Sequence, residues 1–177
     1  MGNEGGVSGT NDKQLELKET GVKTNEGLLV IEKKIYRQNS SRMETLRVKK
    51  KIDIRFSEVD SMNVVWHGNY MLYLEDAREA FGQEYGLDYL TIFHNGYYAP
   101  LVDVRLQYKH PVVYGMHPEI EITYQPTEAA KILFEYRISE GDTLIVAANT
   151  VQVFMDKEYR LVLGNPPFYE EWKKKWL

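Results

Sequence analysis

Cysteine is absent from the 177-residue sequence, and this absence excludes several kinds of site at once. A disulfide framework, a thiolate metal site, a cysteine nucleophile and thiol redox chemistry all require it. No hydrophobic run approaches the roughly 18 to 20 residues that span a bilayer. The first residues also lack the basic and apolar regions of a signal peptide, so we expect a cytoplasmic protein with no membrane span.

An excess of basic charge is absent as well. Lysine and arginine together number 22 and aspartate and glutamate 26, which gives a formal net charge of −4 at pH 7. Because nucleic-acid-binding domains usually carry surplus positive charge, this balance argues against a nucleic-acid partner. Hydrophobic residues make up 43% and charged residues 27% of the chain, as in typical globular proteins, and the length suits one domain with a buried core.

Motifs for metal or serine chemistry are missing too. The histidines show neither HxxxH nor HxH spacing; they are His67, His94, His110 and His117. Without cysteine to support them, this spacing predicts no zinc site. The sequence has no GxSxG motif, which argues against a serine hydrolase. We therefore expect the protein to need no metal and no other cofactor.

The composition divides the chain into segments. Residues 1–27 are rich in Gly, Asn, Thr, Glu and Lys, and their scattered apolar residues predict a mobile N-terminal extension. Residues 28–47 include the apolar stretch LLVIEKKIY, and we expect this segment to pack on or beside the core. Residues 48–165 have the patterning of a folded domain. Residues 166–177 place large apolar side chains at every fourth position, which predicts a C-terminal helix.

Apolar periodicity predicts one long helix. Over Asn69–Tyr85 the apolar side chains recur at intervals of three and four residues, and Gly86 follows as a stop signal. A shorter helical stretch is indicated over residues 88–94.

Alternation of apolar and polar residues predicts strands before and after the long helix along the sequence. A first strand is indicated where Ile52, Ile54 and Phe56 alternate with charged residues. Further strands are expected over residues 102–108, 119–124, 132–138 and 143–154. The last of these is apolar in both registers, which predicts a central strand covered on both faces.

This order of elements limits the fold. The turn Glu140-Gly141-Asp142 predicts a hairpin between the last two strands, so the sheet should be antiparallel. An antiparallel sheet needs cover for its apolar face, and only one long helix is available. We therefore predict an α+β fold in which a curved antiparallel sheet wraps around one central helix.

The stretch from Arg55 to Arg78, RFSEVDSMNVVWHGNYMLYLEDAR, points to a chemistry. Asp60 lies in a loop before the predicted helix, and His67 and Gly68 lead into the helix. A carboxylate is thereby placed near free backbone N–H groups at a helix N-terminus. This pairing suits acyl transfer, because the amides can hold a developing oxyanion while the carboxylate attacks or activates water.

Simpler structural roles stay open for these residues when they are taken one by one. Asp60 also suits a turn or a capping position, because its side chain can accept hydrogen bonds from nearby backbone N–H groups. His67 also suits a packed or capping histidine with no part in proton transfer.

The same segment resembles the signature of hot-dog-fold acyl-CoA thioesterases of the 4-hydroxybenzoyl-CoA thioesterase-like type. That pattern combines an Asp, a Gly-containing turn, apolar residues, an aromatic residue or His, Asn-Tyr, and a helix with Tyr-x-Glu-x-Ala-Arg. In this sequence the pattern falls on Asp60, Asn63, Val64-Val65-Trp66, His67, Asn69-Tyr70 and Tyr73-x-Glu75-x-Ala77-Arg78. The resemblance extends over about residues 48–156, and it implies a hot-dog thioesterase domain over residues 48–165.

The resemblance also implies roles for individual residues. Asp60 would be the catalytic carboxylate, either as nucleophile or as general base, and the backbone N–H of His67 would polarise the thioester carbonyl. Trp66, Asn69 and Tyr70 would shape the acyl pocket or hold the loop.

The resemblance further implies an activity and an assembly. The activity is hydrolysis of an acyl-CoA thioester, or of an acyl carrier protein thioester, to a free acid. The assembly is a homodimer or homotetramer with its active site at a subunit interface. Two alternatives stay open: a hot-dog dehydratase or hydratase, which needs a His paired with a carboxylate, and a non-catalytic acyl-CoA-binding or regulatory protein.

Overall fold

The computed structural model describes residues 45–177. The expectation of a mobile extension over residues 1–27 therefore lies outside the described residues. The same is true of residues 28–47, except for their last part, residues 45–47, in which Leu46 is buried in the core.

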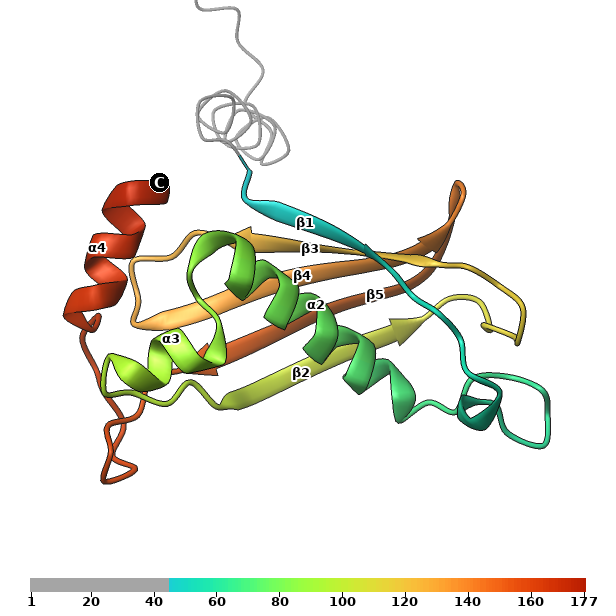
Figure 1. Ribbon diagram of the computed structural model, residues 1–177, viewed down its shortest axis with the longest axis horizontal. Helices are drawn as coiled ribbons and strands as arrows, with labels where there is room; N and C mark the ends of the chain where they lie inside the picture. The colour runs from blue at the N-terminus through green and yellow to red at the C-terminus, as the bar shows by residue number, and fades with distance from the viewer. Residues whose placement is uncertain (1–44) are drawn as a thin grey trace, which may run out of the picture. The chain divides into compact units, whose positions relative to one another are not determined.

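A curved antiparallel sheet forms the body of the described chain, with one long helix across its inner face (Figure 1). The strands are β1 (Arg47–Lys51), β2 (Leu101–Tyr108), β3 (Glu119–Gln125), β4 (Lys131–Glu140) and β5 (Thr143–Val153). Their order across the sheet is β1-β3-β4-β5-β2, and every neighbouring pair is antiparallel. The predicted hot-dog α+β fold is confirmed.

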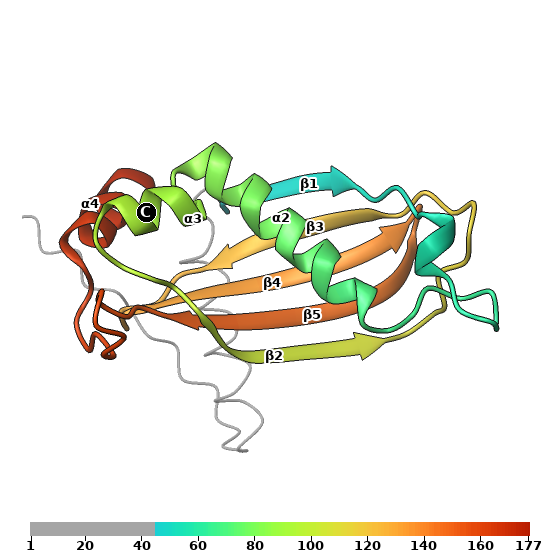
Figure 2. The same cartoon turned by 60° about the horizontal axis from the view of Figure 1, so that its bottom comes forward.

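The helices lie over and beside this sheet. The long helix is α2 (Asn69–Tyr85), and Figure 2 shows it crossing the concave face between the edge strands β1 and β2. The short helices α3 (Tyr89–His94) and α4 (Pro167–Trp176) lie at one end of the sheet. The 3₁₀ helix η2 (Phe56–Glu58) lies at the other end. Of the described helices, none is long and apolar enough to cross a membrane.

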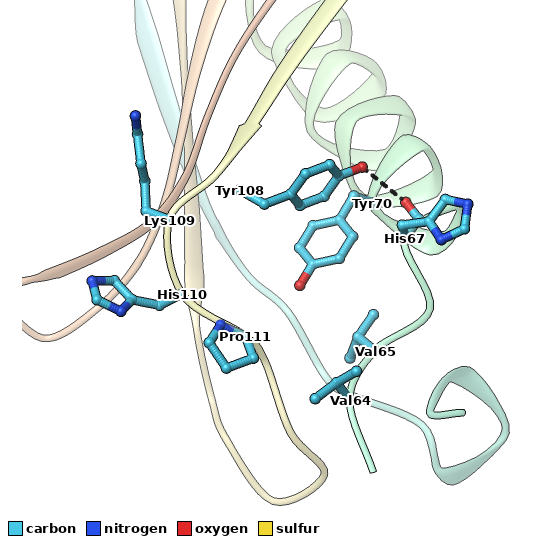
Figure 3. A pocket seen from close by; sticks show the side chains of 8 residues that line it. All are labelled: Val64, Val65, His67, Tyr70, Tyr108, Lys109, His110 and Pro111. Atoms are coloured by element: carbon cyan, nitrogen blue, oxygen red, sulfur yellow. Dashed lines mark hydrogen bonds between the residues drawn. The ribbon is translucent and has the colours of Figure 1, made fainter. Parts of the chain in front are cut away.

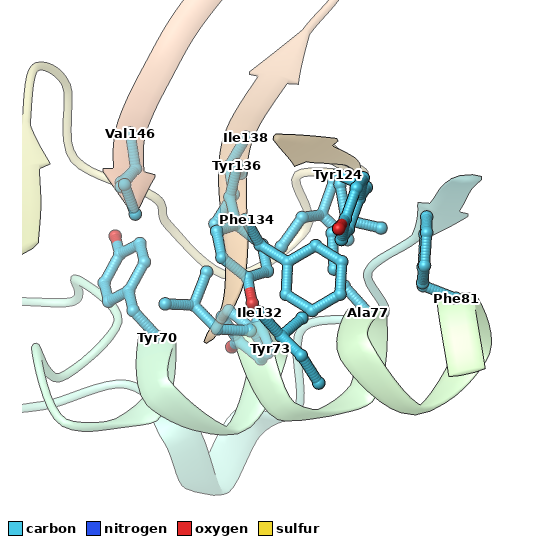
Figure 4. Close-up of a cluster of buried hydrophobic side chains, with 14 of the residues drawn as sticks. Tyr70, Tyr73, Ala77, Phe81, Tyr124, Ile132, Phe134, Tyr136, Ile138 and Val146 are labelled. Atoms are coloured by element: carbon cyan, nitrogen blue, oxygen red, sulfur yellow. The ribbon is translucent and has the colours of Figure 1, made fainter. Parts of the chain in front are cut away.

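Helix α2 has the limits that its sequence predicts. Its buried side chains lie on one stripe and face the sheet (Figure 4); they are Tyr70, Tyr73, Leu74, Ala77 and Phe81. The helix ends at Gly86, which has a φ of +79° and whose N–H donates to the carbonyl of Gly82 at 2.7 Å. Glycine adopts this left-handed conformation without steric cost, which explains why the helix stops there.

The core lies between α2 and the inner face of the sheet. Even-numbered residues of β3 and β4 supply most of the sheet's contribution: Ile120, Ile122, Tyr124, Ile132, Phe134, Tyr136 and Ile138. Helix α4 closes one end, where the Tyr169 hydroxyl donates to the Lys131 carbonyl at 2.8 Å and lies 2.7 Å from the Tyr124 hydroxyl. The Trp172 indole N–H donates to the Tyr85 carbonyl at 2.7 Å.

The first strand lies earlier in the chain than predicted. Strand β1 ends at Lys51, and Phe56, which the alternation would bury, is 74% exposed in η2. The pairing with β3 runs out because β3 starts at Glu119, directly after Pro118. Ile52 still donates to the Pro118 carbonyl at 2.8 Å, but Pro118 has no N–H to continue the ladder.

The prediction that the strand over residues 143–154 is covered on both faces is wrong for the described part of the chain. Strand β5 does lie inside the sheet, and Val146 is fully buried under α2. On the outer face, however, Asn149 is exposed between Arg105 and Glu135 of the neighbouring strands. In the second register Ile145 is fully buried, whereas Ala147, Val151 and Val153 are only half-buried, so the outer face of β5 is partly covered.

Substitution of Gly82 by alanine should destabilise the fold. An added Cβ would lie 2.4 Å from Cα and 2.5 Å from N of Asp88, and this backbone cannot move aside without displacing α3. We expect a loss of about 1–3 kcal/mol in the free energy of unfolding, measured by urea denaturation. Gly164→Ala is the control, because nothing lies within 4 Å of its added Cβ. Equal unfolding midpoints for the two variants would contradict the close approach.

Candidate functional site

Asp60 lies in a tight turn between η2 and α2. Its Oδ1 accepts a hydrogen bond from the Met62 N–H at 2.8 Å and lies 3.5 Å from the Val64 N. Its Oδ2 accepts no hydrogen bond from residues 45–177. Asn63 has a φ of +61°, a left-handed conformation that asparagine tolerates better than most residues with a Cβ. The turn thus holds one carboxylate oxygen and leaves the other available.

Short backbone contacts fix this turn in the fold. The Asp60 N–H donates to the Val64 carbonyl at 2.9 Å, which closes the turn on itself. The Val65 N–H donates to the Val112 carbonyl at 2.8 Å, and Val64 pairs with Val113 in an isolated bridge. The turn is therefore attached to the loop that follows β2.

The N-terminus of α2 lies directly after this turn. The Asn69 N–H donates to the Trp66 carbonyl at 2.9 Å, but the N–H of His67 finds no acceptor in the described part of the chain. Backbone amides at a helix N-terminus carry partial positive charge and stabilise a negatively charged group. The role of the His67 amide as an oxyanion donor stays a prediction, and the structure leaves this N–H unpaired among residues 45–177.

A cavity of about 270 Å³ opens at this end of α2 (Figure 3). Two separate segments line it: Val64, Val65, His67 and Tyr70 from the turn and helix, and Tyr108, Lys109, His110 and Pro111 from the end of β2. The Tyr108 hydroxyl donates to the His67 carbonyl at 3.2 Å, and the rings of Tyr70 and Tyr108 meet edge to face with centroids 5.1 Å apart. Burial raises the pKa of Tyr70, so its hydroxyl stays protonated at neutral pH.

The predicted site residues divide between the cavity and its supports. His67 and Tyr70 line the cavity, whereas Asp60 is not among the residues on its wall. Trp66 is 51% exposed, and its ring covers Gly68, where an added Cβ would lie 1.9 Å from the ring. The Asn69 side chain donates to a backbone carbonyl of the preceding loop, so it holds the loop and does not contact the cavity.

Glu58 joins the turn to the helix. Its carboxylate Oε2 accepts hydrogen bonds from the Tyr73 hydroxyl at 2.8 Å and from the Arg55 N–H at 2.9 Å. Its carbonyl accepts from the Trp66 N–H at 2.9 Å and from the Asn69 Nδ2 at 2.9 Å. Burial, and then the bond to Glu58, raises the pKa of Tyr73, so the hydroxyl remains a donor over the physiological range.

Sequence reasoning missed two groups of residues here. The segment from Tyr108 to Pro111 is distant from the motif along the chain, and only the end of the strand alternation at Tyr108 marks its place. Glu58 and Tyr73 were also missed as supports of the turn, because an apolar stripe on a helix predicts a core tyrosine and not a hydrogen-bond donor.

Charged groups elsewhere show no metal site. Within residues 45–177 no cluster of His, Asp and Glu has the geometry to hold a metal ion. None of the histidines in this part of the chain forms an ion pair with a carboxylate. Glu75 and Arg78, three residues apart on α2, form an ion pair.

Comparisons with known proteins identify the family and the relatives of this chain. The model of the thioesterase-like superfamily matches residues 54–176. A Bacillus subtilis protein named "Putative acyl-CoA thioesterase YneP" is 30% identical over 111 residues, which cover 62% of this chain and 80% of that protein.

Solved structures share the fold. Hypothetical protein TT1821 from Thermus thermophilus is 26% identical and has a TM-score of 0.64, with 72% of this chain and 96% of that chain covered. A DHNA-CoA thioesterase from Staphylococcus aureus has a TM-score of 0.65 at 21% identity, with 73% of this chain and 89% of that chain covered.

The conformation of Asn63 predicts opposite effects for two substitutions. Asn63→Ala should lower the free energy of unfolding by about 1 kcal/mol, because a Cβ-bearing residue without a short polar side chain tolerates positive φ poorly. Asn63→Gly should leave stability unchanged or raise it, because glycine adopts this conformation freely. Urea unfolding of both variants is the measurement. A higher free energy of unfolding for Asn63→Ala than for Asn63→Gly would contradict the left-handed turn.

Proposed function

Because the chain belongs to the thioesterase-like superfamily, we propose that it hydrolyses an acyl-CoA thioester to a free carboxylic acid and coenzyme A. Two observations carry this proposal: Asp60, in the turn before α2, has a carboxylate with one oxygen free of hydrogen bonds, and His67, where α2 begins, has an unpaired N–H among residues 45–177. The activity named for the B. subtilis relative supports it.

The proposed reaction places the thioester carbonyl oxygen at the His67 N–H, beside the cavity. As the carbonyl carbon becomes tetrahedral, negative charge develops on this oxygen, and the helix amide stabilises it. The carbon–sulfur bond then breaks, the electron pair leaves with the coenzyme A sulfur, and the thiolate takes up a proton. Neither step requires a metal or redox group from the protein.

Asp60 supplies the attack by one of two routes. As a general base, its carboxylate removes a proton from water while the water oxygen bonds to the carbonyl carbon. As a nucleophile, the carboxylate oxygen itself bonds to this carbon, and water later cleaves the resulting acyl-enzyme anhydride. Both routes need a carboxylate oxygen free of hydrogen bonds, and Oδ2 meets this requirement among the described residues.

We also propose that the protein is a homodimer, alone or paired into a homotetramer, and that β2 forms the interface. Both β1 and β2 are sheet edges, but β1 has the sequence RVKKK, whose charges disfavour edge pairing. Strand β2 is longer and exposes Val102 at its edge. Antiparallel pairing of two copies would bring the start of one β2 beside the end of the other, where the cavity lies.

The lining of the cavity suits an acyl group with an apolar body. Its walls combine the aromatic rings of Tyr70 and Tyr108 with the side chains of Val64 and Val65. Such a surface accepts an aromatic or a medium-length aliphatic group. An acyl carrier protein thioester has the same reacting group, so it belongs to the substrates to be tested beside acyl-CoA.

Replacement of the proposed catalytic carboxylate should abolish most turnover. In Asp60→Asn the amide oxygen still accepts from the Met62 N–H, so the turn should persist while the proton acceptor is lost. We expect kcat to fall by at least about 10² without a change in unfolding. Coenzyme A release from short, medium, long and aromatic acyl-CoAs is followed with a thiol reagent, to which a protein without cysteine adds no background.

Asp142→Asn, in the hairpin turn between β4 and β5, is the matched control and should keep wild-type turnover. Near-full turnover by Asp60→Asn would contradict the catalytic assignment. Binding of acyl-CoA with no turnover by the wild type would favour a non-catalytic binding protein. Addition of water to an enoyl-CoA would favour a hydratase.

A charge on the β2 edge should separate the proposed dimer. Val102 is 58% exposed, and a lysine there would have to lose its hydration to enter the interface. We expect Val102→Lys to sediment as a monomer of about 20.7 kDa and to lose turnover. Leu163→Lys, at a residue that is 85% exposed and outside the sheet, should behave as the wild type. A wild-type protein that sediments as a monomer would contradict the interface.

A further inference from the structure

We propose that Glu58 and Tyr73 act as a positioning pair that sets the place of the Asp60 carboxylate relative to the His67 amide. The inference rests on the proposed function, in which Asp60 and the His67 amide act on the same thioester. Neither Glu58 nor Tyr73 lines the cavity beside His67, although both line a separate cavity of about 510 Å³, so the role proposed for them is positioning and not substrate contact.

The hydrogen bonds within the turn do not fix this place by themselves. Asp60 bonds to Met62 and Val64, which move together with it as parts of the same turn. These bonds define the shape of the turn, and the bond from Val65 to Val112 attaches it to the loop after β2, but none of them joins the turn to α2. A separate connection must set the position of the turn relative to the helix that carries the oxyanion-holding amide.

Glu58 supplies that connection, because it lies two residues before Asp60 and is bonded to the helix at both its backbone and its side chain. Trp66, Asn69 and Tyr73 all donate to it, at distances of 2.9, 2.9 and 2.8 Å. Asn69 and Tyr73 are four residues apart on α2, so their side chains lie on one face of the helix start. Glu58, the last residue of η2, is thus held by two side chains of α2 and by the backbone of Trp66 just before the helix.

Burial makes the Tyr73 bond the strongest part of this connection. The Tyr73 side chain is only 6% exposed, and its ring packs edge to face against Tyr70 with centroids 5.8 Å apart. Its hydroxyl therefore has a defined position, and a carboxylate that accepts from it is held by a rigid donor. A bond from a neutral donor to a charged acceptor is also stronger than a neutral pair.

Loss of the bond between Tyr73 and Glu58 should lower the rate of the chemical step more than it weakens the binding of substrate. If the connection is weakened, the turn keeps its own hydrogen bonds but takes up several positions against the helix. The fraction of molecules with the carboxylate and the amide in the reactive arrangement then falls, because small displacements of reacting groups reduce rates strongly. Substrate contacts in the cavity are unchanged.

The test compares two tyrosine variants on the same helix. Tyr73→Phe removes the hydroxyl that donates to Glu58. Tyr85→Phe is the matched control, because it removes a hydroxyl that donates to the Arg47 carbonyl at 3.2 Å, far from the turn along α2. We expect kcat of Tyr73→Phe to fall about 10-fold to 10²-fold with KM within about threefold, and Tyr85→Phe to match the wild type.

A second pair of variants separates the hydrogen bond from the charge. Glu58→Gln keeps an oxygen that accepts from both Tyr73 and Arg55, so it should retain most of kcat. Glu58→Ala loses the acceptor and should resemble Tyr73→Phe. The two Glu58 variants also test the proposal if Tyr73→Phe does not fold. Equal kcat for Glu58→Ala and Glu58→Gln would overturn the proposal, as would equal kcat for the two tyrosine variants.

Hydrogen exchange gives a readout that does not depend on activity. The Trp66 N–H donates to the Glu58 carbonyl, so its exchange should be faster in Tyr73→Phe than in Tyr85→Phe. Unchanged protection would overturn the positioning role even if kcat falls. If the wild type hydrolyses no thioester, the proposed function fails, while the exchange of this amide still shows whether the pair holds the turn.

Discussion

The burial of one face of α2 against the concave sheet is the constraint on which the rest of the structure depends. Among residues 45–177 this helix is the only long one, and its stripe from Tyr70 to Phe81 covers the apolar inner face of the sheet. Because the helix must lie in this place, its N-terminus emerges at one end of the sheet. The segment between η2 and α2 and the end of β2 both lie there as a result (Figure 2), and His67 and Tyr108 line one cavity.

Much of this arrangement could be predicted from the sequence, and the exceptions have physical reasons. The limits of α2 follow from its apolar period and from Gly86, and the later strands follow from their alternation. The first strand was misplaced because alternation says where a strand is able to form, whereas Pro118 on the partner decides where pairing ends. A single sequence contains no sign of that partner.

In the candidate site, too, some residues could be predicted from the sequence and others could not. Asp60 and the His67 amide were found because both belong to one short motif, in which spacing along the chain reports spacing in the fold. The opposite wall, around Tyr108, comes from a segment brought near only by tertiary packing. Glu58 and Tyr73 lie within the motif, but their bond depends on how the loop folds back onto the helix, and residue types alone do not reveal it.

The two edges of the sheet differ in a way that bears on how the protein behaves at high concentration. Continued growth of a sheet into a fibre needs two edges that each accept a new strand, so that every added copy offers a fresh one. Strand β1, with a basic residue at four of its five positions, resists the approach of an identical edge. Pairing through β2 alone is therefore self-limiting: it consumes the receptive edge of each copy and stops at two.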